Sequence, residues 1–75
     1  MGNRLADARR ARGWTQADLA GRLRAAYPEC RATPNLISQW ENGRATPSLL
    51  NGMRLASVLG ETAEALFPLA PPQAH

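Results

Sequence analysis

The sequence predicts an all-α fold of five short helices, and three kinds of observation support it. Hydrophobic residues recur at helical spacing in several segments. Threonines suited to capping a helix stand at positions 15, 33, 46 and 62, and glycines suited to ending one stand at 13, 43 and 60. No segment alternates as a strand does, and no repeat occurs. With 75 residues the chain forms one small domain.

The first two helices are predicted over residues 3–12 and 15–26. Gly13 ends the first, and Thr15 with Asp18 forms a variant of the capping box that opens the second. Tyr27 precedes a proline, which disfavours helical backbone and ends the second helix there. The predicted inner side of the two helices consists of Leu5, Ala8, Ala11, Leu19, Ala20 and Leu23.

The third helix is predicted over residues 33–42. Thr33 can cap its first turn, Pro34 fits the first helical position, and Gly43 suits the left-handed residue after its end. The apolar side consists of Leu36, Ile37 and Trp40, and the polar side of Asn35, Ser38, Gln39 and Asn42. Exposed amides and a hydroxyl without an acid can read base edges in a major groove. The same pattern also fits an ordinary amphipathic helix with a polar outer side.

The fourth helix is predicted to begin at the Thr46-Pro47 pair and to end at Gly60. Thr62 is predicted to cap a fifth helix over residues 63–67. The domain therefore covers residues 1–67, and residues 68–75 form a flexible proline-rich tail. The inner side of the fourth helix is predicted to consist of Leu49, Met53, Ala56 and Leu59.

Charge is distributed unevenly along the chain. All nine basic residues are arginines, and most precede residue 33, while Glu61 and Glu64 lie in the carboxyl-terminal part. This asymmetry suits a nucleic-acid-binding face opposite a protein-contacting face. The chain lacks a membrane-spanning run and a signal-peptide pattern, so we expect a cytoplasmic protein.

Catalytic and metal-binding patterns are missing. Cys30 is the single cysteine and His75 the single histidine, so neither a disulfide framework nor a metal cluster is expected. The carboxylates are dispersed, and no glycine-rich phosphate loop occurs. The sequence predicts no enzyme and no cofactor. Cys30 fits an ordinary loop cysteine or a redox sensor, and the former is favoured.

A set of motifs along residues 5–67 resembles a known family. The motifs are Gly13-Trp14-Thr15-Gln16, Leu19-Ala20, Ile37-Ser38, Trp40-Glu41-Asn42-Gly43, Pro47-Ser48-Leu49, Leu55-Ala56, Leu59-Gly60 and Leu66-Phe67. They are similar to the xenobiotic-response-element family of helix-turn-helix proteins, which includes phage repressors and Cro proteins. The resemblance implies a five-helix lambda-repressor-like domain whose third helix enters the major groove.

The resemblance also implies roles for single residues. The implied base contacts are Asn35, Ser38 and Gln39, whereas Pro34 lacks a donor at a position that often reads bases. The implied phosphate contacts are Gln16, Thr33, Asn42 and Arg44. The resemblance pairs Arg9 with Glu41 in an internal ion pair, and matches Trp14 and Trp40 to core sites.

The segment over residues 21–32 departs from the family, because it is several residues longer than the usual tight turn. The extra residues either lengthen the second helix or form a loop, which Tyr27 can pack. Arg31 lies either beside the DNA or in solvent on this loop.

The resulting hypothesis is a transcriptional regulator that binds a palindromic DNA operator as a homodimeric repressor or autoregulator. The alternative is the antitoxin of a toxin–antitoxin pair, and a third reading is an interaction module without DNA binding. Leu66, Phe67 and Leu69 are candidates for the dimer interface, although Leu66 and Phe67 can equally complete the core of one chain.

Overall fold

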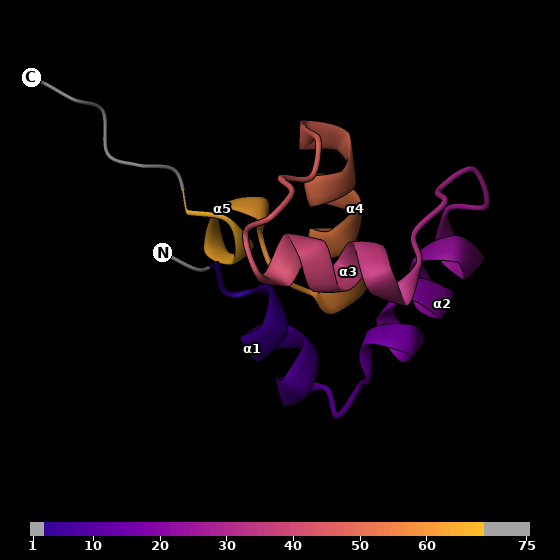
Figure 1. Cartoon of the computed structure of the whole chain (residues 1–75), viewed down its shortest axis with the longest axis horizontal. Coiled ribbons are helices and arrows are strands. Elements are labelled where there is room, and N and C mark those ends of the chain that lie inside the picture. Colours follow the sequence, from indigo (N-terminus) through magenta and orange to yellow (C-terminus); the bar gives the residue numbers. More distant parts are fainter. Residues whose placement is uncertain (1–2, 69–75) are drawn as a thin grey trace, which may run out of the picture.

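The structure, a computed structural model, describes residues 3–68, and within this range it contains five α-helices and no strand (Figure 1). This confirms the all-α, five-helix prediction. The helices are α1 (Leu5–Ala11), α2 (Gln16–Ala26), α3 (Pro34–Glu41), α4 (Leu49–Leu59) and α5 (Ala63–Leu66). Helix α2 packs against α3 and α4, α1 against α3, and α5 against α4. None of the helices within residues 3–68 combines the length and the hydrophobicity of a membrane span.

One hydrophobic core joins all five helices. Each helix is shorter than the ~12–15 residues at which an isolated helix becomes marginally stable, so the shared core has to hold the helices. The buried side chains are Leu5, Leu19, Ala20, Leu23, Cys30, Ala32, Ile37, Trp40, Leu55, Ala56, Leu59 and Leu66. Trp40 therefore belongs to the core, as its motif implies. Trp14 is half-buried and packs against this core, and its ring centroid lies 4.2 Å from the Arg22 guanidinium carbon.

Hydroxyl side chains cap the starts of four helices. Thr15, Thr33 and Thr62 each accept the backbone N–H of the residue three positions on, as predicted. The predicted start of the fourth helix at Thr46-Pro47 is wrong. Ser48 is the cap there, since its hydroxyl accepts the Asn51 N–H at 3.1 Å. Serine is the stronger capping residue, and α4 accordingly begins two residues later.

The inner side of α4 also differs from the prediction. Leu49 and Met53 are 79% and 55% exposed, whereas Gly52, Leu55, Ala56 and Leu59 are buried. Gly52 is inside because the Phe67 ring packs over it, at 4.0 Å from the position that a Cβ would take. A glycine adds nothing to a hydrophobic pattern. The spacing of the hydrophobic residues therefore predicted the wrong inner side for the first turns of α4. In α1, Ala11 is likewise exposed, whereas Leu5 and Ala8 face the core.

Glycine ends α3 as predicted. Gly43 has a φ of +73° and follows the cap residue Asn42. The Gly43 N–H donates to the Trp40 carbonyl at 3.3 Å, and the Arg44 N–H donates to the Gln39 carbonyl at 2.9 Å. These two bonds form a Schellman motif, which directs the chain away from the helix axis and towards α4.

The long segment between α2 and α3 divides into two parts. Residues 21–26 continue α2, and residues 27–32 form a loop. Both alternatives raised by the sequence thus hold in part. The loop is attached to the core, because Cys30 and Ala32 are buried in it and Tyr27 packs against it. Cys30 is therefore a core residue within the loop, not a surface thiol.

Candidate nucleic-acid interface

Helix α3 separates an apolar inner side from a polar outer side. Ile37 and Trp40 are buried, whereas Asn35 and Asn42 are exposed, and Ser38 and Gln39 are half-buried. Residues three and four apart share one side of a helix, so these four polar residues lie together. The Asn42 Nδ2 donates to the Ser38 Oγ at 3.3 Å, which places this pair directly side by side. The structure thus brings the three implied base contacts together.

Glu41, the one acid of α3, is turned inward and neutralised. The Arg9 Nε donates to Glu41 Oε2 at 2.6 Å, and the Arg9 Nη2 donates to Oε1 at 3.2 Å. The two side chains are only 10% and 5% exposed. The hydrogen bond to Glu41 raises the pKa of Arg9 above its ordinary value. Because Arg9 also donates to the Trp14 carbonyl at 2.8 Å, the pair links α1, the turn after it and α3.

Gln16, an implied phosphate contact, joins the same cluster. Its Nε2 donates to Glu41 Oε1 at 3.0 Å, so the first residue of α2 is held against the last residue of α3. The N-terminus of a helix presents backbone N–H groups that suit an anion. The amide nitrogen of the Gln16 side chain is directed to Glu41, which leaves the side-chain carbonyl oxygen of Gln16 for another partner.

Asp18 places a negative charge at the same helix start. Its carboxylate accepts the Thr15 N–H at 2.9 Å, and the Thr15 hydroxyl accepts the Asp18 N–H at 3.0 Å. The hydrogen bond that the carboxylate accepts from the Thr15 backbone N–H, followed by its interaction with the Thr15 side chain, lowers the pKa of Asp18 below its ordinary value. The carboxylate stabilises the start of α2, but it weakens the attraction of this site for a phosphate.

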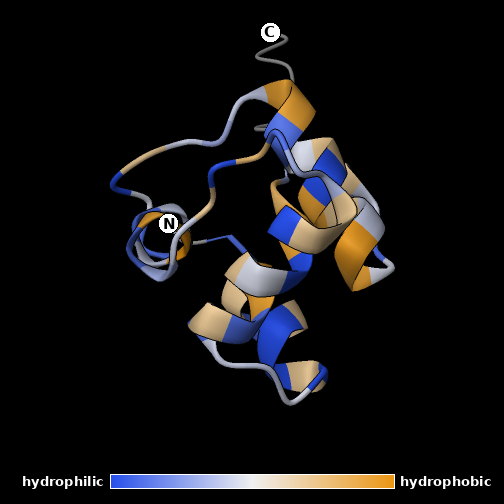
Figure 2. Cartoon of the chain, turned by 90° about the vertical axis from the view of Figure 1, so that its right-hand side faces the viewer, coloured by the Kyte–Doolittle hydropathy of each residue, from blue (hydrophilic) through white to orange (hydrophobic). Residues whose placement is uncertain are grey.

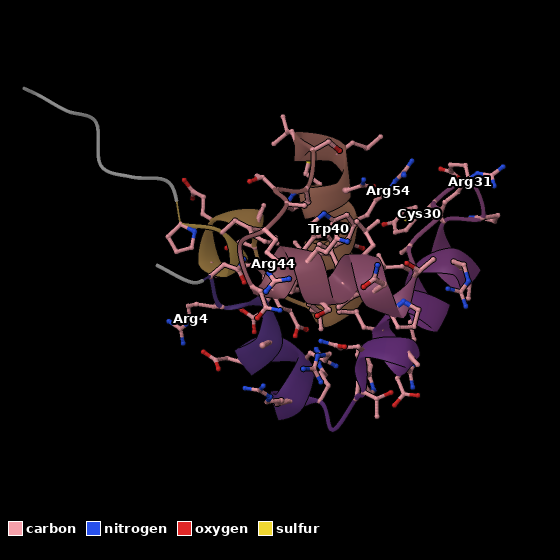
Figure 3. The ribbon with its side chains drawn as sticks, in the orientation of Figure 1. Arg4, Cys30, Arg31, Trp40, Arg44 and Arg54 are labelled. Atoms are coloured by element: carbon pink, nitrogen blue, oxygen red, sulfur yellow. The ribbon has the colours of Figure 1, made fainter. Side chains whose placement is uncertain are left out.

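Two exposed arginines flank α3. Figure 3 shows Arg44 in front of its carboxyl-terminal half and Arg31 out on the loop that leads to its start. Thr33 caps α3 by accepting the Leu36 N–H at 3.1 Å, which leaves its own hydroxyl hydrogen free to donate. An arginine therefore lies near each end of α3, and a hydroxyl donor lies at its start.

The loop before α3 is held by residues that the sequence did not single out. The Arg54 Nη2 donates to Glu29 Oε2 at 2.9 Å, its Nη1 donates to Asn51 Oδ1 at 3.3 Å, and its guanidinium carbon lies 5.4 Å from the Tyr27 ring centroid. Figure 3 shows Arg54 beside Cys30, between α4 and the loop. The Arg24 Nη1 donates to the Ala32 carbonyl at 2.6 Å. Sequence reasoning had no signal for the contacts of Arg54 with Glu29 and Tyr27, since they join segments that are distant in the sequence.

The predicted dimer residues have different environments. Leu66 is 1% exposed and completes the core of its own chain, so its side chain offers no surface to a partner. Its carbonyl also accepts the Arg4 N–H at 2.9 Å, which ties α5 to the start of α1. Phe67 is half-buried, and Leu69 lies outside the described residues. Among the described residues no group of side chains could hold a metal ion.

Comparison with known proteins identifies the family to which this chain belongs. A family model described as a helix-turn-helix domain matches residues 2–70, which is nearly the whole chain. No curated protein matches the chain, and no solved structure does. Helices α2 and α3 pack against each other across the connecting loop, with the polar side of α3 facing outward. The chain belongs to the helix-turn-helix domain family.

Proposed function

We propose that this protein is a sequence-specific DNA-binding transcriptional regulator of the xenobiotic-response-element type, with α3 as its recognition helix. One observation carries the proposal: the outer side of α3 presents Asn35, Ser38 and Gln39, while the one acid of the helix is buried against Arg9. The helix can approach negatively charged DNA because its outer side offers hydrogen-bonding groups and no negative charge.

In this mechanism the residues that contact bases differ from the residues that contact phosphates. Asn35 and Gln39 can each bond bidentately to adenine, and Ser38 can bond to several bases. Arg31, Arg44, Asn42, Gln16 and Thr33 are the proposed phosphate contacts, which fix the orientation of the helix without reading sequence. A homodimer on a palindromic operator would then repress or autoregulate by covering a promoter.

Selection of bound duplexes from a random pool tests the proposal. We expect enrichment of a two-fold symmetric site with at least one adenine–thymine pair in each half that depends on Gln39 or Asn35. Enrichment of no sequence, together with no salt-dependent binding to any duplex, would leave a protein-interaction module as the function.

A second candidate function is the antitoxin of a toxin–antitoxin pair. Exposed Leu49, Leu50 and Met53 favour it, since exposed apolar residues that cluster mark surfaces for protein contact. Co-expression with the product of the adjacent gene tests it. Stable co-purification and loss of that product's toxicity would support the antitoxin, and a regulator alone would show neither.

A further inference from the structure

The first two turns of α4 expose an apolar surface. Leu49 is 79% exposed, and Leu50 and Met53 are each 55% exposed. Beside them lies an open groove of about 310 Å³, whose apolar lining includes Pro47 and Phe67. We name Leu49, Leu50, Met53 and this groove the α4 patch. In Figure 2 the hydrophobic colour reaches the upper end of the molecule, where α4 begins.

Charge is nearly absent from the α4 patch. Residues 45–53 contain no charged side chain, although the chain as a whole has a net charge of +3. Glu64 is the one charged residue in the lining of the groove. The patch thus differs from the surfaces near α1, α2 and the 27–32 loop, where arginines are frequent.

We propose that the α4 patch is where two copies of this chain associate about a two-fold axis. The inference rests on the proposed function, because it supplies the interface of the proposed homodimer. In a two-fold contact the same surface is present on both sides, so a charged patch meets its own charge. An uncharged apolar patch meets no such repulsion, and it excludes water from both copies.

Residues 69–75 are a poor alternative occupant of the α4 patch. Phe67 is the last residue along the chain that lines the groove, and residues 69–75 contain a single large aliphatic side chain, Leu69. One such side chain cannot cover Leu49, Leu50 and Met53 together with the groove. A second copy brings three exposed apolar side chains of its own.

The position of the patch agrees with a DNA-bound dimer. Figure 1 shows the first turns of α4 projecting beyond α3, at the edge of the molecule and not over the outer side of α3. Association at this edge leaves Asn35 and Gln39 uncovered. A two-fold axis through this edge can place both α3 helices on one side of the dimer, as adjacent half-sites about one helical turn apart require.

The size of the patch implies a weak dimer in free solution. A standard interface takes about 800 Å² from each partner, which would be roughly a sixth of the 4958 Å² surface of this chain. Three side chains and one groove do not reach that area. We therefore expect association that depends on protein concentration and is reinforced when one duplex offers two half-sites.

The test compares Leu49→Glu/Met53→Glu with the control Ala11→Glu/Ala25→Glu, which adds the same charge at exposed helical positions. Sedimentation equilibrium measures association, and titration on the selected site compares a single half-site with the full palindrome. We expect the patch variant to be monomeric, to bind the half-site like the control, and to lose on the order of 10–100-fold in affinity for the palindrome. Far-UV circular dichroism verifies that both variants are folded.

Three results would overturn the inference. The patch variant could dimerise as the control does, or the wild type could stay monomeric and fill two half-sites independently. Alternatively, a chain ending at Pro68 could associate more tightly than the full chain, which would make the tail the occupant of the patch. If the wild type binds no duplex but dimerises through the patch, the proposed function fails and this interface stands.

Discussion

At the residue scale, the environment of Glu41 determines what α3 can do. A free carboxylate at the end of a recognition helix would repel phosphates. Here it accepts hydrogen bonds from both Arg9 and Gln16, and its side chain is 5% exposed. One acid thus fixes three segments and leaves the outer side of α3 free of negative charge.

Breaking this ion pair should destabilise the fold. Arg9→Ala leaves the Glu41 carboxylate buried without its main partner, and Glu41→Ala leaves the guanidinium in the same position. We expect each to lower the free energy of unfolding by about 2–4 kcal/mol, measured by urea titration. Arg10→Ala, at an exposed neighbouring position, is the control and should stay within about 0.5 kcal/mol of wild type. If both pair variants unfold like the control, the pair has no structural role.

A second residue-scale prediction distinguishes a base contact, by Gln39, from a phosphate contact, by Arg44. Gln39→Ala should cost about 1–3 kcal/mol on the selected site and relax the preference at one base pair. Its affinity for random duplex should hardly change, because the contact is with a base edge. Arg44→Ala should weaken specific and random binding alike.

Equal losses for Gln39→Ala on both kinds of duplex, with the base preference intact, would show that Gln39 does not read. Gln16→Ala is a poorer control than Arg44→Ala, because the Gln16 side-chain amide also donates to Glu41. Its removal would change the surroundings of the Arg9–Glu41 ion pair.

At the element scale, the end of α4 depends on its glycine. Gly60 has a φ of +70°, and a Cβ there would lie 2.5 Å from the Arg12 Nη2, which donates to the Leu59 carbonyl. Gly60→Ala should therefore lower the free energy of unfolding by about 1–2 kcal/mol. Gly21→Ala is the matched opposite: it lies inside α2 with open space around it, so we expect a gain of about 0.5–1 kcal/mol. Thermal unfolding measures the stability of both variants. Equal effects of Gly60→Ala and Gly21→Ala would contradict the role of Gly60 at the end of α4.

The start of α2 should contribute a pH-dependent share of stability. The hydrogen bonds from Thr15 lower the pKa of Asp18 in the folded protein. A carboxyl with a lowered folded pKa stabilises the fold fully above its ordinary value of about 3.9 and loses that contribution as the pH falls through the lower folded value.

Asp18→Asn should accordingly be less stable than wild type at neutral pH, and the difference should shrink as the solution is acidified below about pH 4. Urea titrations at several pH values measure it. Asp7→Asn, on the exposed side of α1, serves as the control. Its stability difference from wild type should vary less with pH than that of Asp18→Asn. A gap between Asp18→Asn and wild type that is constant with pH would mean that the charge of Asp18 is not involved.

At the scale of the whole molecule, DNA binding should depend steeply on salt. A chain with a net charge of +3 and arginines at both ends of α3 releases condensed counterions when it binds duplex DNA. We expect a linear fall of log affinity with log salt concentration, and Arg44→Ala should reduce that slope by about one. Fluorescence anisotropy over a salt series measures it. A slope near zero would contradict phosphate contact.

The sequence by itself determined the local features. The threonine caps at positions 15, 33 and 62, the Thr15–Asp18 capping box and the glycine after α3 act through groups a few residues apart, so they could be predicted without knowing the fold. The polar side of α3 could also be predicted, since helical spacing alone groups Asn35, Ser38 and Gln39. Likewise, the arginine asymmetry and the helix-turn-helix motifs are properties of the chain order.

Only the tertiary structure decided which surfaces are covered. The sequence placed Leu49 and Met53 inside, yet Phe67 packs over Gly52 and turns the other side of α4 inward. It treated Cys30 as a loop residue, and the fold buries it. The bonds from Arg54 to Glu29 and from Gln16 to Glu41 join segments about 25 positions apart. Such contacts depend on how the helices pack together, and packing is a property of the whole core that no single segment encodes.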